Sequence, residues 1–206
     1  MTELDLKQIA RTAERAADHA RREIIPRFRC VGVETKADGT PVTQADRAAE
    51  KVMREIFEAE YPEFSFLGEE SGEARRQSRY QWVVDPIDGT LSFTRGLPFF
   101  ATLIALLEDG EPIFGLIDLP MLDQRYVGWK GAGCRCNGVP VRVSQETDLK
   151  RAIISHGDPT CFEKAGERDA FFVFGVTRFC DRNRVHLGLA AELLDRQVES
   201  VTRLRP

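Results

Sequence analysis

The chain has 206 residues, of which 42% are hydrophobic and 30% charged, and its 29 basic and 33 acidic residues give a net charge of −4. This composition is typical of one globular core or two small lobes, and the charge excludes a general basic field for nucleic acid. No run of 18 apolar residues is present, which excludes a membrane-spanning helix, and the charged N-terminus and five scattered cysteines predict a cytoplasmic protein with reduced thiols.

Two helices are predicted near the N-terminus. Apolar side chains recur every three to four positions over residues 4–25, and Pro26 ends this pattern. Asp38-Gly39 then favours a hairpin turn, and a second helix is predicted from residue 44 to about 60. Its predicted inward face consists of Ala45, Ala48, Ala49, Val52, Met53, Ile56 and Phe57. The segment 64–73 is predicted to be a short strand that ends in acidic residues.

Strands are predicted for most of the chain up to residue 144. The apolar run 81–85 predicts a buried strand, 99–120 predicts two strands around an acidic turn, and 124–144 predicts further strands with a turn at Asn137-Gly138. One more strand is predicted over 151–156 and a helix over 184–200. Two helices followed by hairpins indicate an α+β layered fold, with an N-terminal lobe over 1–150 and a partial C-terminal lobe over 151–206.

Acidic residues occur where three of these apolar segments end. They are Asp46, Glu69 with Glu70, and Asp85 with Asp88. The last two belong to the stretch "WVVDPIDGT", and two carboxylates so close together repel each other unless a cation lies between them. Mg²⁺ prefers oxygen ligands, and a helix that begins at Gly89 would present free N–H groups to a phosphate. The residues alone leave open a simpler reading, in which Asp85 is an N-cap and Asp88-Gly89 a turn.

Three motifs resemble the inositol monophosphatase superfamily of Mg²⁺-dependent, lithium-sensitive phosphatases. They are "WVVDPIDGTLSF" at 82–93, Gly-Glu-Glu-Ser at 68–71 and "VTQAD" at 42–46, and the resemblance covers roughly residues 1–150. It implies a layered α-β-α-β(-α) sugar-phosphatase-like fold with an incomplete C-terminal lobe. The partners that it implies are a small phosphomonoester and a second copy of the chain, and neither nucleic acid nor a membrane.

The resemblance also implies a role for each residue of the motifs. Glu69, Asp85 and the carbonyl of Ile87 would bind a first Mg²⁺, Asp85 and Asp88 a second, and Glu70 with Asp46 would lie near a third, so that each site holds two or three ions. The implied catalytic residues are Asp46, Glu69 and Thr90, of which Thr90 and Asp46 would orient and deprotonate the attacking water. The implied substrate-binding residues are Asp88, Gly89, Thr90 and Asp181. Hydrolysis would be direct, without a covalent intermediate.

The substrate is suggested by "TLSFTRGLP" at 90–98 followed by "TLIAL" at 102–106. This pattern resembles the bacterial histidinol-phosphate phosphatase branch and implies L-histidinol phosphate as substrate, in histidine biosynthesis. Inositol-1-monophosphatase is the alternative. The family's late aspartate, in a Trp-Asp or Tyr-Asp pair, has no counterpart after Asp88, which predicts a weaker second ion. A truncated metal-binding domain with little or no activity is therefore a third alternative.

Overall fold

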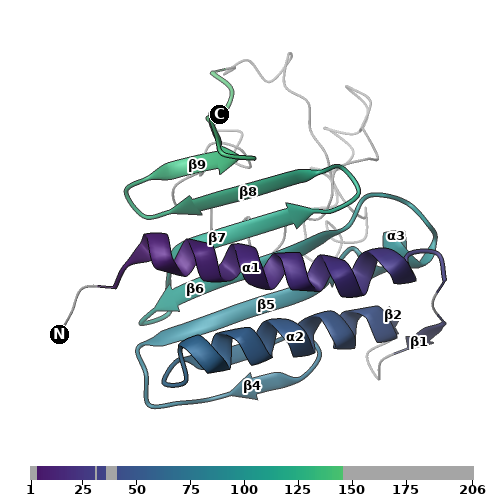
Figure 1. Ribbon diagram of the computed structural model, residues 1–206, viewed down its shortest axis with the longest axis horizontal. Helices are drawn as coiled ribbons and strands as arrows, with labels where there is room; N and C mark the ends of the chain where they lie inside the picture. Colours follow the sequence, from purple (N-terminus) through teal and green to yellow (C-terminus); the bar gives the residue numbers. More distant parts are fainter. Residues whose placement is uncertain (1–3, 31, 36–40, 146–206) are drawn as a thin grey trace, which may run out of the picture.

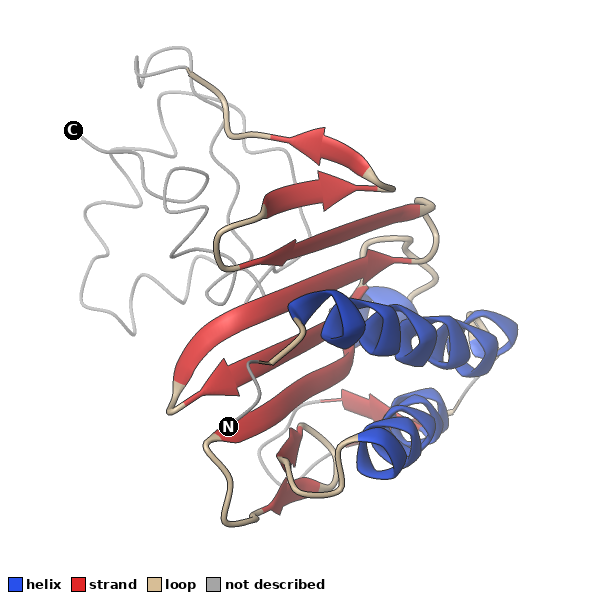
Figure 2. Cartoon of the chain, turned by 60° about the vertical axis from the view of Figure 1, so that its left-hand side comes forward, coloured by secondary structure: helices blue, strands red, loops and turns tan. Residues whose placement is uncertain are grey.

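Two helices cover one face of an eight-stranded sheet in the computed structural model, which describes residues 4–30, 32–35 and 41–145 (Figures 1 and 2). The helices are α1 (Leu6–Ile24) and α2 (Gln44–Glu60). This arrangement confirms the predicted α+β fold. The strand and helix predicted at 151–156 and 184–200, and with them the division into two lobes, fall outside the described residues.

The sheet has the strand order β10-β9-β8-β7-β6-β5-β3-β4, and β3 and β5 are its one parallel pair in the part of the chain described. Its strands are β3 (Ser65–Gly68), β4 (Gly72–Ala74), β5 (Tyr80–Asp88), β6 (Ala101–Glu108), β7 (Glu111–Leu119), β8 (Gln124–Trp129), β9 (Gly133–Cys136) and β10 (Val139–Val141). The remaining elements are β1 (Val33–Thr35), β2 (Pro41–Thr43), a 3₁₀ turn η1 (Ile25–Arg27) and a short helix α3 (Thr90–Thr94).

Helix α1 confirms the predicted period. The Asp5 side chain accepts hydrogen bonds from the backbone N–H groups of Lys7 and Gln8 and so caps the helix. The buried face consists of Ile9, Ala10, Thr12, Ala13, Ala16, Ala17, Ala20 and Ile24. Its many alanines let the helix approach α2 and the sheet closely. Neither α1 nor any other described helix is long and apolar enough to cross a membrane.

Helix α2 has the predicted bounds but a different buried face. Asp46 and Glu50 are buried, whereas Ala48, Val52 and Ile56 are only half-buried. Ile56 still packs against the core, so the predicted inward face was wrong at Ala48 and Val52. The two acids can be buried because they accept hydrogen bonds from neighbouring segments, which offset the loss of hydration.

Strand β5 extends beyond the predicted range 81–85 and continues through the Asp-Pro-Ile-Asp segment. Its pairing with β6 shifts in register between Asp85 and Asp88, so the segment is an irregular strand end with a bulge. The hairpin predicted around 99–120 is confirmed, with Asp109 and Gly110 at positive φ in its turn. The turn at Asn137-Gly138 is confirmed in the same way.

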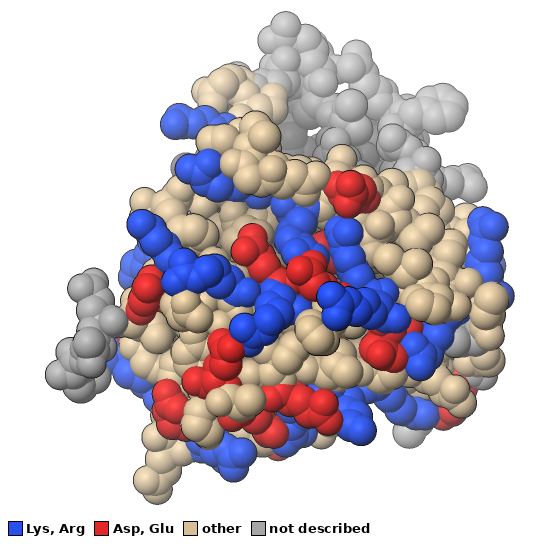
Figure 3. All heavy atoms as spheres, viewed as in Figure 1, with Lys and Arg blue, Asp and Glu red and all other residues tan. Residues whose placement is uncertain are grey.

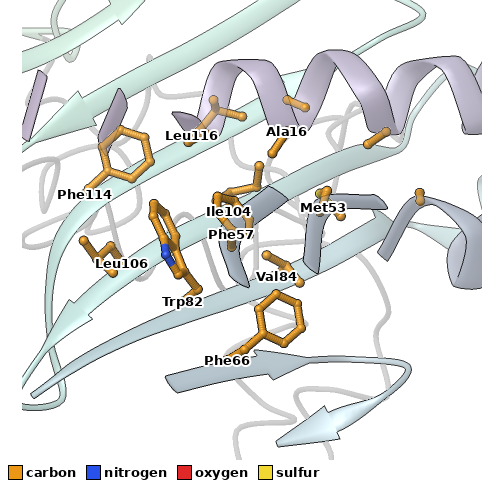
Figure 4. Packing of buried hydrophobic residues seen from close by; sticks show 14 of the residues in the cluster. Ala16, Met53, Phe57, Phe66, Trp82, Val84, Ile104, Leu106, Phe114 and Leu116 are labelled. Carbon is orange, nitrogen blue, oxygen red and sulfur yellow. The ribbon is translucent and has the colours of Figure 1, made fainter. Parts of the chain in front are cut away.

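The core lies between the two helices and the sheet (Figure 4). Trp82 of β5 stacks on Phe57 of α2 with the ring centroids 4.1 Å apart, and Phe114 of β7 meets Trp82 edge-on. Both Phe57 and Trp82 are at most 1% exposed. This aromatic group joins α2 to the middle of the sheet.

A buried ion-pair group joins α1 to the sheet as well. Asp118 of β7 is fully buried, and its carboxylate accepts hydrogen bonds from Arg21 of α1 and from Arg125 of β8. On the face of the molecule that carries α1 and α2, lysines and arginines are interspersed with aspartates and glutamates, and no large patch of one sign appears (Figure 3).

We expect Phe57→Ala to lower the free energy of unfolding by about 3–5 kcal/mol, because it removes the ring that packs on Trp82. Urea denaturation followed by circular dichroism would measure this. Val139→Ala is the control, since Val139 is 65% exposed and its truncation should change the stability by less than about 0.5 kcal/mol. Equal effects of the two substitutions would contradict the assignment of the core.

Candidate metal and phosphate site

The acidic segments predicted from the sequence meet at one edge of the sheet. Strands β3 and β5 run parallel, with Gly68 beside Val84, and the backbone N–H of Glu69 donates to the carbonyl of Val84 at 3.1 Å. Glu69, which follows β3, and Asp85, which follows Val84 within β5, therefore lie next to each other. Helix α2 begins at the same edge, because Asp46 Oδ1 is 3.5 Å from the hydroxyl of Thr90.

The end of β5 is held in shape by side chains. The backbone N–H of Ile87 donates to Asp85 Oδ1 at 3.0 Å, and the buried hydroxyl of Thr102 donates to the carbonyl of Pro86 at 2.8 Å. Gly89 then adopts φ +88°, and a Cβ atom there would lie 2.9 Å from the carbonyl oxygen of Phe99. Only glycine fits this turn, after which α3 begins at Thr90, as expected.

The carboxylates at this edge repel each other. Burial, together with the negative charge of Glu69 and Asp88, raises the pKa of Asp85 to about 9. Burial and the charge of Glu69 raise the pKa of Asp88 to about 7. Two carboxyl groups with such pKa values hold protons at a pH where ordinary aspartates are ionised.

No cationic side chain offsets this repulsion within the described residues. Asp85 and Asp88 form no ion pair with a described arginine or lysine, in contrast to the buried Asp118 with its two arginines. Asp88 Oδ2 is buried and has no hydrogen-bond partner there either. A buried, unpartnered carboxylate oxygen is costly, so the arrangement is that of a site with room for a positive charge.

Asp46 caps helix α2 with one carboxylate oxygen and faces Thr90 with the other. It accepts hydrogen bonds from the backbone N–H and the hydroxyl of Thr43 and thereby completes the capping box of α2. Its other oxygen faces Thr90, whose hydroxyl lies closer to the carbonyl of Ile87, at 3.0 Å. Burial raises the pKa of Asp46, although its bonds with Thr43 oppose the shift.

These residues fit a hard divalent cation by their chemistry. Carboxylate oxygens of Glu69, Asp85 and Asp88 and the carbonyl of Ile87 are oxygen donors of the kind that Mg²⁺ takes, and Asp88 Oδ2 has no hydrogen-bond partner among the described residues. Among the described residues, however, no three histidine, cysteine, aspartate or glutamate side chains already converge on one point. Side-chain rotation would therefore have to complete a metal cage.

Two residues of this site were missed from the sequence. Thr102 supports the bulge, and Glu50 accepts hydrogen bonds from the backbone N–H groups of Glu70 and Ser71. The spacing of Glu50 from Asp46, one helical turn on the buried face, was the available signal. Asp181, predicted to contact substrate, lies outside the described residues.

The raised pKa values predict that the metal-free protein loses stability as the pH rises. The unfolded chain releases these protons near pH 3.8, whereas the folded chain holds them until about pH 7 at Asp88 and about pH 9 at Asp85. The unfolded state therefore binds fewer protons in this window, and stability falls with pH. In EDTA we expect Tm to fall between pH 5 and pH 8, and Asp88→Asn to reduce that fall by roughly 5 °C.

Glu63→Gln is the control for this experiment, because Glu63 is exposed and lies before β3. It should leave the pH dependence of Tm as in the wild type. A pH profile that Asp88→Asn leaves unchanged would show that the carboxylates do not interact as described.

Known proteins share this fold and these motifs. The sequence model of the inositol monophosphatase family matches residues 5–169. A histidinol-phosphatase of Mycobacterium tuberculosis is 40% identical over 144 residues, 68% of this chain and 55% of that protein. An inositol-1-monophosphatase of Rhizobium meliloti is 37% identical over 128 residues, 62% of this chain and 48% of that protein. The structure of an inositol monophosphatase from Zymomonas mobilis matches with a TM-score of 0.72 and 40% identity, covering 86% of this chain and 68% of that one.

The chain thus spans 55% and 48% of the lengths of the two relatives compared by sequence. The matched region includes α1, α2, the whole described sheet and all the acidic residues brought together at its edge. With this match over most of its length, the chain belongs to the inositol monophosphatase family.

Proposed function

We propose that this protein is a Mg²⁺-dependent phosphomonoesterase that acts on L-histidinol phosphate. The observation that supports the proposal is the group of repelling carboxylates at the ends of β3 and β5, with a buried oxygen of Asp88 that lacks a partner among the described residues. A cation would remove both the repulsion and the unsatisfied oxygen. The motifs that carry these residues are those of a phosphatase family.

In this proposal Glu69, Asp85 and the carbonyl of Ile87 hold a first Mg²⁺, Asp85 and Asp88 a second, and Glu70 with Asp46 a third, weaker one. Bound Mg²⁺ would supply an acidified water and would neutralise charge on the leaving oxygen. The Ile87 carbonyl can serve while it accepts the Thr90 hydroxyl, since a carbonyl oxygen has two lone pairs.

Side chains and backbone groups of the protein would position the attacking water, accept its proton and bind the phosphate. The one proton of the Thr90 hydroxyl can point to the carbonyl of Ile87, 3.0 Å away, or to Asp46 Oδ1, 3.5 Å away. In either orientation the hydroxyl oxygen can still accept a hydrogen bond from water. Burial raises the pKa of Asp46 and makes its carboxylate a stronger base than an exposed aspartate. Gly89 presents bare backbone next to Thr90, where the phosphate would bind, and Asp181 is the proposed further contact to the substrate.

The choice of substrate rests on the 90–106 segment and on the 40% identity to a histidinol-phosphatase. Inositol 1-phosphate is the second candidate, because an inositol-1-monophosphatase is 37% identical and the inositol monophosphatase structure 40% identical. A role in histidine biosynthesis and a homodimer stay predictions that follow from the same resemblance. A cytoplasmic location stays a prediction that follows from the scattered cysteines and the charged N-terminus.

We expect phosphate release from L-histidinol phosphate that requires Mg²⁺ and exceeds release from inositol 1-phosphate. Colorimetric phosphate assays with both substrates, over a Mg²⁺ titration, would measure this. A preference for inositol 1-phosphate would replace the substrate assignment with the second candidate. No release from either substrate, by a folded chain that binds Mg²⁺ in calorimetry, would instead indicate a metal-binding domain without turnover.

Two substitutions separate metal binding from proton transfer. Asp85→Asn should abolish both Mg²⁺ binding and turnover, because it removes the proposed bridging ligand. Thr90→Ala should lower kcat by about 100-fold or more while Mg²⁺ binding persists, and Thr90→Ser should restore activity. Calorimetric titration and kcat of each variant would check this, with Glu63→Gln as control. Full Mg²⁺-dependent activity in Asp85→Asn would refute the assignment of Asp85 as a ligand shared by the first and second Mg²⁺.

A further inference from the structure

One helical turn after Asp46, α2 buries a second acid that the roles above do not use. Glu50 is 2% exposed, and both oxygens of its carboxylate are hydrogen-bonded to the turn after β3. Oε2 accepts the backbone N–H of Glu70 and Oε1 that of Ser71, each at 2.7 Å. The two acceptor oxygens thus hold two successive amides of the turn that carries Glu69.

The fit between this carboxylate and the chain is close. A Cβ atom on Gly68 would lie 2.4 Å from Cδ of Glu50 and 2.5 Å from its Oε1. Any larger residue at position 68 would therefore displace the carboxylate. One turn further along α2, Arg54 contacts the same segment through the Ser71 hydroxyl and the Phe66 ring.

A purely structural contact does not require an acid here. Burying a charge costs several kcal/mol unless strong bonds offset it, and Glu50 forms no ion pair with a described arginine or lysine. Glutamine would offer one acceptor oxygen and an NH₂ group that faces a backbone donor. Aspartate is one methylene shorter. Of these side chains, only glutamate is long enough to offer one acceptor oxygen to each of the two N–H groups. This indicates that the position of the turn, and of the Glu69 that it carries, is important.

We propose that Glu50 is a positioning residue, which fixes the turn at Glu69–Ser71 so that the Glu69 carboxylate faces Asp85. This inference rests on the proposed function, because it assigns a purpose to the turn as a carrier of a cation ligand. Replacement of residues that orient metal ligands without binding the metal themselves commonly lowers metal affinity by about 10- to 100-fold.

Glu50→Gln and Gly68→Ala test the contact from its two sides. The first removes one acceptor and the charge, and the second pushes the carboxylate away and keeps the charge. We expect each to weaken Mg²⁺ binding in calorimetry by about 10-fold or more. The double variant should be no weaker than the worse single variant, since both break one contact. Glu55→Gln, a charge loss at an exposed position of the same helix, should change the affinity less than about twofold.

Amide hydrogen exchange, resolved by residue, gives a readout that does not depend on the cation. In the wild type the N–H groups of Glu70 and Ser71 should be protected although Ser71 is exposed, and in Glu50→Gln their protection should fall at least about tenfold. Unchanged protection together with unchanged Mg²⁺ affinity would overturn the inference, as would an equal loss of affinity in Glu55→Gln. If the wild type bound no Mg²⁺, the proposed function would fail, and hydrogen exchange alone would decide whether Glu50 holds the turn.

Discussion

The parallel pairing of β3 with β5 is the constraint on which the acidic site depends. Parallel strands run toward the same end of a sheet, so Glu69, just after β3, and Asp85, just past the last residue of β5 that pairs with β3, become neighbours. Strand β4 returns antiparallel on the outer side of β3, and the chain then passes to the inner side to form β5. With an antiparallel β3–β5 pair the two acids would lie at opposite ends of the strands, and the charge of Glu69 would not raise the pKa of Asp85.

Four acids of the described chain, two of them buried and two half-buried, are accommodated in three different ways. Asp118 is neutralised by two arginines and joins α1 to the sheet. Glu50 is satisfied by two backbone amides. Asp85 and Asp88 receive neither treatment in full, and their charges oppose the folded state. Such local cost is typical of sites shaped for activity rather than stability, and the rest of the fold, with its continuous aromatic core, offsets it.

The sequence predicted the elements whose signals are local. The helical period of α1, the bounds of α2 and the turns at Asp109-Gly110 and Asn137-Gly138 all follow from neighbouring residues. The prediction failed where distant segments decide. The strand predicted over 81–85 continues to Asp88, because the bulge and the Thr102 hydroxyl accommodate Pro86 within β5. Glu50 was not included in the predicted inward face of α2, because the backbone amides that satisfy its carboxylate come from the turn after β3.

The stacking of Trp82 on Phe57 has a spectroscopic consequence. Trp82 lies three residues before Asp85 on β5, and Phe57 belongs to the helix that carries Asp46 and Glu50, so the indole contacts both elements that shape the acidic edge. The sequence has one other tryptophan, Trp129, on the half-buried end of β8. Phe114, which pairs with Trp129 across the sheet, also meets Trp82, so the two indoles belong to one core. Emission from Trp82 is therefore an intrinsic optical signal of how β5 and α2 sit against each other.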